Sequence, residues 1–400
     1  MEKRVLIFTN HFDPEYFKIN DIVDWIKDNG NEVTVVTGNP NYPKGKIYHG
    51  YSTLGSFEKK ENLSVYRLPL IPRGKGSKIM LILNYLSYFK VSFLFTLFYL
   101  IPKKKFDVVL VHHTSPPFIF IPALLYKRIK KSQLYLWDLD MWPQTLEATG
   151  ILKSKSVLKL LERIFKSFYK GFDLIYLGSK YFEKIALKRV DSSFVKHFPN
   201  WADSIFEKAK LKGASISEKE KIIISYSGNI GESQDLESLV EAVSLIEKKN
   251  FEIRLIGDGR NKKTLINLVS KKGLNDVIKF FESVKPKELL NYFEESHFLY
   301  LSLKNTPLFQ KTVPAKFQTY LSVGIPIIGY ISGETNDLIN RHNLGFSCES
   351  NDINQLATIL MDISTLKDKN YQKMKVDCKS MYTKEYHSIE RKKDILSLIK

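Results

Sequence analysis

The sequence predicts an α/β protein of two doubly wound domains, each a parallel sheet with helices on both faces. Three observations predict this fold. Strand, helix and strand follow one another at the start of the chain, the same order begins again near residue 222, and a polar segment lies between. Short apolar strands that alternate with helices are typical of parallel sheets covered on both faces. A chain of 400 residues is long enough for two such domains.

The first strand–helix–strand unit occupies the opening residues. Residues 5–8 are an apolar run of strand length, apolar residues recur at helical spacing over 22–26, and residues 33–36 form the second strand. Gly30 lies where a helix would end. In open sheets of this kind ligands bind beyond the carboxyl ends of the strands.

The second half repeats this order. Strands are expected at 222–226, 251–256, 277–281 and 298–303, with amphipathic helices between them. The segment 199–222 is polar and charge-rich, so the boundary is expected between residues 200 and 220. We therefore expect one domain over 1–203 and a second over 204–380, with a ligand cleft between two facing sheets.

The charge is unevenly distributed. The formal net charge is +18, and residues 1–200 hold 31 Lys and Arg against 17 Asp and Glu, which gives +14 of it. A basic half favours a polyanionic partner, either nucleic acid or an anionic membrane. The two cysteines, Cys348 and Cys378, have no metal-ligand spacing, which indicates a reducing compartment.

Residues 79–101 are long and apolar enough for a membrane span, because 18 of the 23 are apolar and only Lys90 is charged. We reject a span, since the strand that follows at 106–113 must join the sheet begun at Val5. Two interpretations stay open: burial inside the protein, or a helix lying in the membrane interface between basic segments. The polar side chains are expected to share no single helical stripe. They are Asn84, Ser87, Lys90, Ser92 and Thr96.

Two glycine turns follow strands of the second half. In "YSGNIG", Gly228 and Gly231 flank Asn229 before a helix, an arrangement in which backbone amides can approach a diphosphate. The alternative is an ordinary turn between strand and helix. "LIGDGR" repeats the pattern. Its candidates for phosphate contact are Gly257, Asp258 and Arg260, and Lys262 and Lys263 behind it are expected at the surface.

Lys316 is the strongest single candidate for binding a phosphate. It follows Pro314 in the first turn of a short helix that ends at Gly324. A cation is unfavourable there, because the helix dipole prefers anions at the N-terminus. A bound anion beside Lys316 would remove that penalty.

Asp138 and Asp140 are candidates for acid–base chemistry. They are two positions apart after a strand and lie among Trp137, Met141 and Trp142, where partial desolvation would raise their proton affinity. The alternative is that one of them caps the next helix. His113 also lies at a strand end, and with His11 and His112 a metal site is conceivable, although no ligand spacing supports one.

Several stretches together carry a family resemblance: "NYPKG", "HHTSPPF", "WDLDMWPQTLEATG", "FPNWAD", "YSGNIG", "IGDG" and "TVPAKFQTYLSVGIPII". With them the chain resembles the retaining glycosyltransferases of family-four type, which have the GT-B fold and use nucleotide-sugar donors. The resemblance runs from residue 5 to about 360. The chain is similar in particular to the branch that builds bacterial capsule and O-antigen repeat units on a lipid carrier, including N-acetyl-L-fucosamine transferases.

The resemblance implies a transfer from a UDP-sugar to a saccharide linked to polyprenyl diphosphate, without bound metal or other cofactor. Gly228, Asn229, Gly231 and Lys316 are expected at the donor diphosphate. The segments around Asn20, Tyr42, Pro43, Lys44 and Asp140 are expected to face the acceptor and the reacting sugar. Residues 381–400 are expected to form a helix that crosses back to the first domain. The protein would lie on the cytoplasmic face of the plasma membrane, as a peripheral or monotopic protein.

One departure from the family pattern concerns the donor sugar. Many members carry two glutamates where this chain has Lys311 and Thr319, so those two contacts are not carried over. Thr319 can offer a hydroxyl to the ribose, Lys311 a cation to the diphosphate or an acetamido group, and Glu334 is a candidate replacement. A degenerate transferase that acts as a scaffold, a nucleic-acid binder and a sugar-nucleotide epimerase are the alternatives. The basic residues are interleaved with a long apolar helix and no nucleic-acid module is recognised, so nucleic acid is not expected as a partner.

Overall fold

The computed structural model describes residues 2–103, 105–148, 152–216 and 221–400. Thr149 and Gly150 of the family motif lie outside them. The chain divides into two compact units. The first contains Met1–Phe198 together with Ile389–Lys400, and the second is Pro199–Ser388. The two doubly wound sheets of the GT-B fold are confirmed, one in each unit.

The first unit contains an eight-stranded sheet in the order β3-β4-β2-β1-β5-β6-β7-β8. Its strands are β1 (Arg4–Thr9), β2 (Glu32–Gly38), β3 (Ser56–Lys60), β4 (Leu63–Leu68), β5 (Val108–His113), β6 (Gln133–Asp138), β7 (Leu174–Leu177) and β8 (Val195–His197). All neighbours are parallel except β3 and β4, a hairpin that the sequence did not predict. The carboxyl ends of β1, β5 and β6 are adjacent, which brings the segments after them together.

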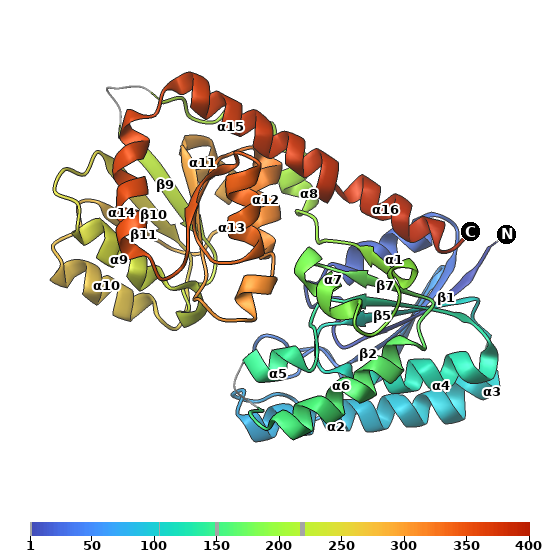
Figure 1. Cartoon of the computed structure of the whole chain (residues 1–400). Helices are drawn as coiled ribbons and strands as arrows, with labels where there is room; N and C mark the ends of the chain where they lie inside the picture. Colours follow the sequence, from blue (N-terminus) through green and yellow to red (C-terminus); the bar gives the residue numbers. More distant parts are fainter. Residues whose placement is uncertain (1, 104, 149–151, 217–220) are drawn as a thin grey trace. The chain divides into compact units, whose positions relative to one another are not determined.

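Helices cover both faces of this sheet (Figure 1). The helices of the first unit are α1 (Ile19–Asp28), α2 (Lys78–Phe95), α3 (Ile101–Lys103), α4 (Phe120–Lys130), α5 (Gln144–Ala148), α6 (Lys155–Tyr169), α7 (Lys180–Ala186) and α16 (Ser388–Ser397). α2, α4 and α6 lie on one side and α1 on the other (Figure 1). In the returning segment, Asp394 pairs with Lys196 of β8 at 2.8 Å.

The second unit contains a parallel six-stranded sheet in the order β11-β10-β9-β12-β13-β14. Its strands are β9 (Ile222–Ser227), β10 (Phe251–Ile256), β11 (Ile278–Phe281), β12 (Phe298–Ser302), β13 (Ile327–Tyr330) and β14 (Gly345–Cys348). Its helices are α8 (Ser204–Glu207), α9 (Leu236–Ser244), α10 (Lys262–Lys271), α11 (Pro286–Glu295), α12 (Ala315–Val323), α13 (Glu334–Arg341), α14 (Ile353–Asp362) and α15 (Asp368–Met381). One apolar cluster lies under α9, α10 and α14, and the other lies under α11, α12 and α13 (Figure 1).

The apolar helix 79–101 is α2 continued by a π-helical turn (Thr96–Leu100) and α3. By length and composition Ile79–Lys103 could cross a membrane. Its connections exclude this, because β4 before it and β5 after it belong to the same sheet. Tyr88 fixes the helix to that sheet by donating from its hydroxyl to the Thr9 carbonyl at 2.8 Å and to the Val36 carbonyl at 3.2 Å.

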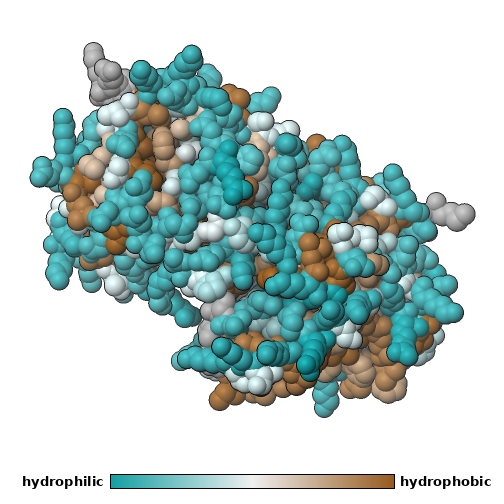
Figure 2. Space-filling model, viewed as in Figure 1, coloured by the Kyte–Doolittle hydropathy of each residue, from teal (hydrophilic) through white to brown (hydrophobic). Residues whose placement is uncertain are grey.

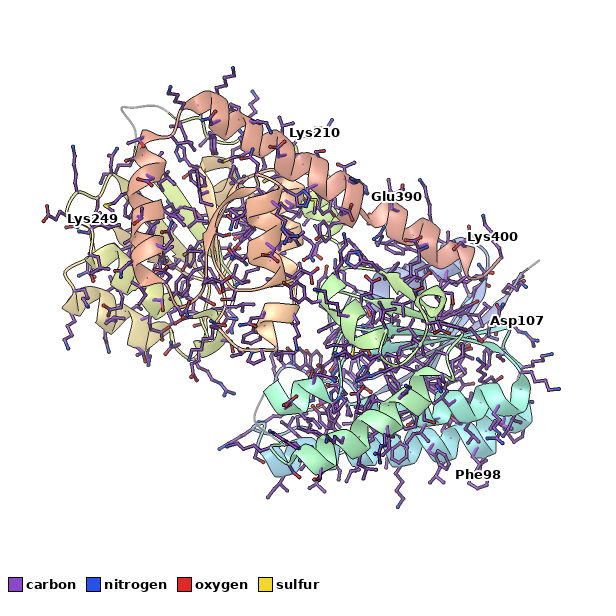
Figure 3. All side chains as sticks on the ribbon, viewed as in Figure 1. Phe98, Asp107, Lys210, Lys249, Glu390 and Lys400 are labelled. Carbon is purple, nitrogen blue, oxygen red and sulfur yellow. The ribbon has the colours of Figure 1, made fainter. Side chains whose placement is uncertain are left out.

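The polarity of this helix is largely inverted. As expected, its five polar residues do not share one stripe, since Ser87 is only half-buried and Lys90 is exposed. Asn84, Ser92 and Thr96 lie on one stripe with Tyr88 and Leu100, and that stripe is the buried one. The Ser92 and Thr96 hydroxyls donate to carbonyls of the helix itself, which satisfies them without other partners. The side chains left outside are large and apolar: Ile79, Ile82, Leu83, Leu86, Leu94 and Phe98. Phe98, which is 70% exposed, projects outward from the helix (Figure 3).

Candidate functional site

Two glycine loops follow β9 and β10 and pack backbone against backbone. The Gly228 amide donates to the Ile256 carbonyl at 2.9 Å, and the Ile230 amide to the Asp258 carbonyl at 2.7 Å. A Cβ on Gly257 would lie 1.9 Å from the Gly228 oxygen, so a side chain is excluded there. Glycine at position 257 is therefore required by the contact between the loops. Gly228 itself is exposed at φ +127°.

Lys316, in the first turn of α12, reaches under the first of these loops. Its Nζ donates to the Tyr226 hydroxyl at 2.5 Å and lies 3.9 Å from the centre of that ring. The Tyr226 hydroxyl in turn donates to the Asn229 carbonyl at 2.5 Å. A Cβ on Gly228 would lie 2.8 Å from Lys316 Cε. The ammonium is thus held against the loop "YSGNIG" by one bridging tyrosine, and only glycine at 228 leaves room for it.

The electrostatics of this cluster favour an anion. Burial lowers the pKa of Lys316 to about 7, and burial raises the pKa of Tyr226 above its ordinary value. An anion beside the ammonium would favour its charged form. Because the amides of Gly228 and Ile230 donate to protein carbonyls, the loop amides available to such an anion are those of Asn229 and Gly231.

The helix α9 does not begin directly after this loop. A short 3₁₀ turn (Glu232–Gln234) follows Gly231, and α9 begins only after Asp235. Asp235 is half-buried, and burial raises the pKa of its carboxyl. The loop after Ser302 is tied to the same turn, since Lys304 pairs with Glu232 at 2.8 Å. An anion at this loop therefore depends on Lys316 and the loop amides.

The other residues that we expect to bind the sugar donor lie on separate segments of the second unit. Asp258 is exposed and accepts from the Gly259 amide at 2.8 Å, and Arg260 is exposed beside it. Lys263 is exposed as expected. Lys262 is not a surface lysine, because it is buried and pairs with Glu282 at 2.9 Å.

Lys311, Thr319 and Glu334 belong to segments near α12 and α13. Thr319 is half-buried, and its hydroxyl bonds to the Ala315 carbonyl at 3.3 Å within α12. Glu334, the first residue of α13, is only 5% exposed. The chain beside Lys311 packs against the start of α13, since a Cβ on Gly333 would lie 2.0 Å from the Gln310 oxygen.

In the first unit, His113 and Asp138 form a buried pair at the ends of β5 and β6. The His113 Nδ1 lies 2.7 Å from Asp138 Oδ1, and the two side chains are 0% and 1% exposed. The other oxygen of Asp138 accepts from the Tyr169 hydroxyl, and Oδ1 also accepts from the Asp140 amide at 3.2 Å. Both carboxylate oxygens of Asp138 are therefore occupied inside the protein. This arrangement suits Asp138 for positioning the loop that follows.

Asp140 is the more accessible carboxylate. One of its oxygens accepts from the Ser115 hydroxyl and the other from the Thr145 hydroxyl at 2.6 Å. Trp142 donates from its indole to the same Ser115 oxygen at 2.6 Å. The Thr145 bond links Asp140 to a side chain of α5. The half-buried position also leaves Asp140 accessible to a ligand.

Arg189 is a central residue of this region that the sequence did not indicate. It is 2% exposed and forms two hydrogen bonds to Glu162, at 2.7 and 2.8 Å. It also donates to the Trp142 carbonyl at 2.6 Å and to the Gln144 side chain at 2.9 Å. Its guanidinium lies 4.6 Å from the Tyr169 ring centre. Arg189 thereby fixes the loop that carries Asp140.

The segments that we expect to bind the acceptor meet at Glu15. This residue, like Arg189, was not indicated by the sequence. The buried Glu15 accepts from the amides of Asn41 and Tyr42 at 2.6 Å each and lies 2.6 Å from His11 Nδ1. The side-chain amide of Asn20 donates to the Glu15 backbone carbonyl at 3.0 Å. Tyr42 is 42% exposed beside this cluster, and Pro43 and Lys44 follow it at the surface.

His11, His112 and His113 lie near the ends of β1 and β5, and the Nε2 atoms of His112 and His113 are buried without a hydrogen-bond partner among the described residues. His11 Nε2 accepts from Arg73 at 3.0 Å, which leaves Nδ1 as the donor to Glu15. Burial, with smaller contributions from His11 and His113, lowers the pKa of His112 to about 3, so its imidazole is neutral. Within the described ranges, no group of three or more His, Cys, Asp or Glu is placed to hold a metal ion.

Comparison with known proteins finds similarity to glycosyltransferases. Residues 207–379 match the family described as glycosyl transferases group 1. The chain is 24% identical over 341 residues to the putative colanic acid biosynthesis glycosyl transferase WcaI of Escherichia coli (strain K12), covering 80% of this chain and 81% of that protein. It is 24% identical over 304 residues to the probable glycosyltransferase WbjE of Pseudomonas aeruginosa, covering 73% and 74%.

Solved structures share the fold over the whole length. Sucrose-phosphate synthase from Thermosynechococcus elongatus matches with a TM-score of 0.70 at 13% identity, covering 99% of this chain and 98% of that one. Anabaena Alr3699/HepE in complex with UDP-glucose matches with a TM-score of 0.64 at 12% identity, covering 99% of each chain. The expected GT-B fold is thus confirmed, and the resemblance to N-acetyl-L-fucosamine transferases stays a prediction.

Proposed function

We propose that the protein is a retaining glycosyltransferase that moves a sugar from a UDP-sugar to a saccharide carried on polyprenyl diphosphate. The observation that carries this proposal is the position of Lys316, held by Tyr226 under the exposed loop at Gly228. Structures with the same fold have been solved with UDP and with UDP-glucose. A diphosphate over this loop would contact the Lys316 ammonium and the amides of Asn229 and Gly231.

The chemistry that this cluster supports is stabilisation of the leaving diphosphate. Negative charge develops on the leaving oxygen as the sugar is transferred, and a pre-positioned cation with backbone amides stabilises that charge. Lys316 would supply the cation, so we expect no requirement for a metal. In the first unit, we propose Asp140 as the carboxylate nearest the reacting sugar. Asp138 and His113 would position the Asp140 loop.

The acceptor side of the proposal rests on the first unit. Six large apolar side chains are exposed along α2 and its continuation, where a soluble protein would bury them. An interfacial helix of this kind would hold the enzyme at the cytoplasmic face of the membrane, where its lipid-linked acceptor lies. We propose that Asn20, Tyr42, Pro43 and Lys44 contact this acceptor.

We further propose a role in bacterial capsule or O-antigen synthesis with an N-acetylated amino sugar as donor. The similarity to a putative colanic acid biosynthesis transferase supports a surface polysaccharide. Lys311 and Thr319 stand where many relatives carry glutamates, which favours a donor recognised by other contacts. Glu334, buried at the start of α13, is our candidate for one of them.

Calorimetric titration with UDP and a panel of UDP-sugars tests the proposal, followed by elongation of a polyprenyl-diphosphate-linked saccharide. We expect UDP binding that the Lys316→Ala variant weakens and turnover with one UDP-sugar of the panel. Binding without turnover across the full panel would favour the alternative of a degenerate scaffold. Absence of UDP binding by the folded protein would refute the donor site.

A further inference from the structure

A second helix exposes an apolar stripe on the same side of the sheet as α2. Val157, Leu160 and Ile164 of α6 recur at helical intervals and are 41%, 55% and 38% exposed. The opposite side of α6 is buried through Phe165, whose ring centre lies 6.3 Å from that of Phe120 in α4. α2, α4 and α6 cover the same face of the sheet (Figure 1), and Figure 2 shows apolar side chains along the edge where α2 lies. We call the exposed apolar residues of α2 and α6 the apolar face.

A stripe of basic residues runs along α6 beside its apolar stripe. These residues recur every three or four positions, and all are exposed: Lys155, Lys159, Arg163, Lys166 and Lys170. A helix with neighbouring apolar and basic stripes is typical of the membrane interface, where long lysine stems follow apolar surface and place their ammonium groups among lipid phosphates. The arrangement favours an anionic lipid surface over a protein partner.

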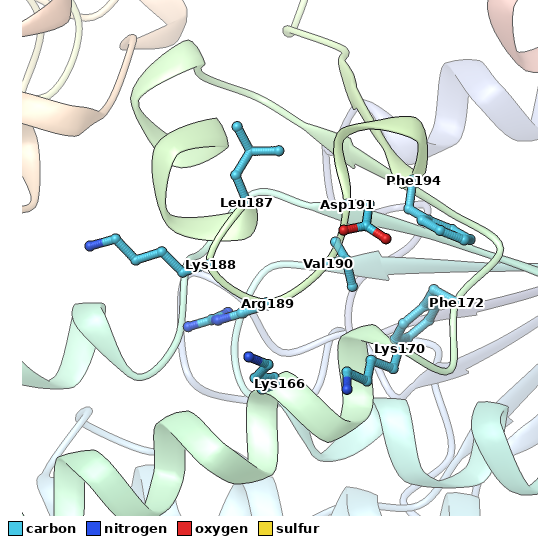
Figure 4. A pocket seen from close by; sticks show the side chains of 9 residues that line it. All are labelled: Lys166, Lys170, Phe172, Leu187, Lys188, Arg189, Val190, Asp191 and Phe194. Atoms are coloured by element: carbon cyan, nitrogen blue, oxygen red, sulfur yellow. The ribbon is translucent and has the colours of Figure 1, made fainter.

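The end of this basic stripe borders a pocket (Figure 4). The pocket has a volume of about 350 Å³ and lies between α6 and residues 187–194. Lys166, Lys170 and Lys188 line it, and Asp191 is the one carboxylate among its lining residues. Arg189 forms part of its wall but is bonded to Glu162, so it contributes a rigid surface more than a free charge. Three exposed ammonium groups around one concave site make it a candidate for binding phosphate.

We propose that this pocket binds the phosphate of an anionic membrane phospholipid, and that α6 is the second helix of the membrane-binding surface. The proposal rests on the membrane attachment in the proposed function and adds to it a defined headgroup site on another helix. The apolar stripe of α6 would enter the interface, and Lys166, Lys170 and Lys188 would then lie near the level of the phosphates. Each basic residue near an anionic surface strengthens binding about fivefold, so the three lysines together contribute about 100-fold at low salt.

The test measures binding of the full-length protein to two kinds of vesicle. One contains phosphatidylcholine alone, and the other contains phosphatidylcholine mixed with phosphatidylglycerol. The pocket variant is Lys166→Ala/Lys170→Ala/Lys188→Ala. The matched control, Lys263→Ala/Lys271→Ala/Lys287→Ala, removes the same charge from exposed lysines of the second unit. We expect the pocket variant to lose about 100-fold in affinity for the anionic vesicles only, and the control to lose much less.

Two further measurements distinguish a defined phosphate-binding site from non-specific electrostatic attraction to the vesicle. Leu160→Ser/Ile164→Ser should weaken binding to both vesicle types, because it removes apolar contact and no charge. Titration with inorganic phosphate distinguishes a site for free phosphate from one for lipid. Equal losses in the pocket and control variants, or phosphate binding without any vesicle effect of the pocket variant, would overturn the proposal. UDP binding, measured on the same variants, should be unchanged, so failure at this pocket is separable from failure of the donor site.

Discussion

The lowered pKa of Lys316 predicts that binding of the proposed donor depends on pH. Burial lowers this pKa to about 7, so about half of the Lys316 side chains in the free protein are uncharged at pH 7. A diphosphate beside Nζ favours the ammonium and raises the pKa. Binding must then take up about half a proton at pH 7 and about 0.9 at pH 8. The affinity therefore falls as the pH rises above 7, approaching about tenfold per unit, and becomes constant well below 7.

The substitution Lys316→Met tests the same ammonium directly. Methionine keeps an unbranched stem beside Gly228 and removes the charge. A hydrogen bond to a charged group contributes about 1.5–3 kcal/mol, which corresponds to binding about 10- to 150-fold weaker below pH 7. The difference between the proteins should shrink as the pH rises, because Lys316 then loses its charge in the wild type as well. Lys316→Arg keeps a charge at every pH and should abolish the proton uptake.

Calorimetry with a UDP-sugar in buffers of different ionisation enthalpy measures both the affinity and the number of protons taken up on binding. A UDP-sugar is preferable to UDP, because a diphosphate esterified at both ends does not titrate near pH 7. Lys263→Met, on an exposed lysine of α10, is the matched control and should bind as the wild type does. An affinity that stays constant from about pH 6 to pH 9 in the wild type would refute the assignment of Lys316 to the diphosphate.

Four further outcomes are expected. Gly228→Ala should weaken UDP-sugar binding at least about tenfold in calorimetry, since the residue has φ +127° and its Cβ would lie 2.8 Å from Lys316 Cε. Asp140→Asn should abolish transfer to a lipid-linked acceptor and leave UDP affinity within a few-fold, whereas equal loss in Asp138→Asn alone would reverse our assignment. Phe98→Ser should weaken vesicle binding about 5- to 30-fold, because burying this 70% exposed ring contributes about 1–2 kcal/mol. Arg189→Ala should lower the free energy of unfolding by about 3 kcal/mol in urea titrations, and an unchanged midpoint would contradict its role.

The sequence predicted the elements with clear periodicity and missed those that depend on distant partners. Four strands of the second unit, β9 to β12, and the strands of the opening strand–helix–strand unit were predicted from short apolar runs between turns. The hairpin β3–β4 was missed because "SFEKKENLSVYRL" is mostly polar and covers the edge of a sheet. Arg189 carries no motif, and its partner Glu162 lies 27 residues earlier in the chain. Its role depends on packing that sequence spacing does not encode.

The site residues also divide into those that local sequence predicts and those that depend on distant partners. Lys316 was identified because a lysine in the first turn of a helix is electrostatically unfavourable, and that argument needs only local sequence. The difference between Asp138 and Asp140 could not be predicted. Both follow a strand at the same face, and only the structure shows that His113 and Tyr169 enclose the first of them.

The inverted helix α2 connects the fold to the membrane proposal. The small hydroxyl side chains at 92 and 96 are fully buried, and they donate their hydrogen bonds to carbonyls of the helix itself. The apolar residues that would normally occupy this buried stripe are on the outside instead, at a cost in water that no contact within the described first unit offsets. A group of exposed large apolar side chains is typical of surfaces that contact a membrane or another protein. Since α6 adds a second exposed apolar stripe beside a row of lysines, an anionic lipid surface is the cover that matches both the apolar area and the charge.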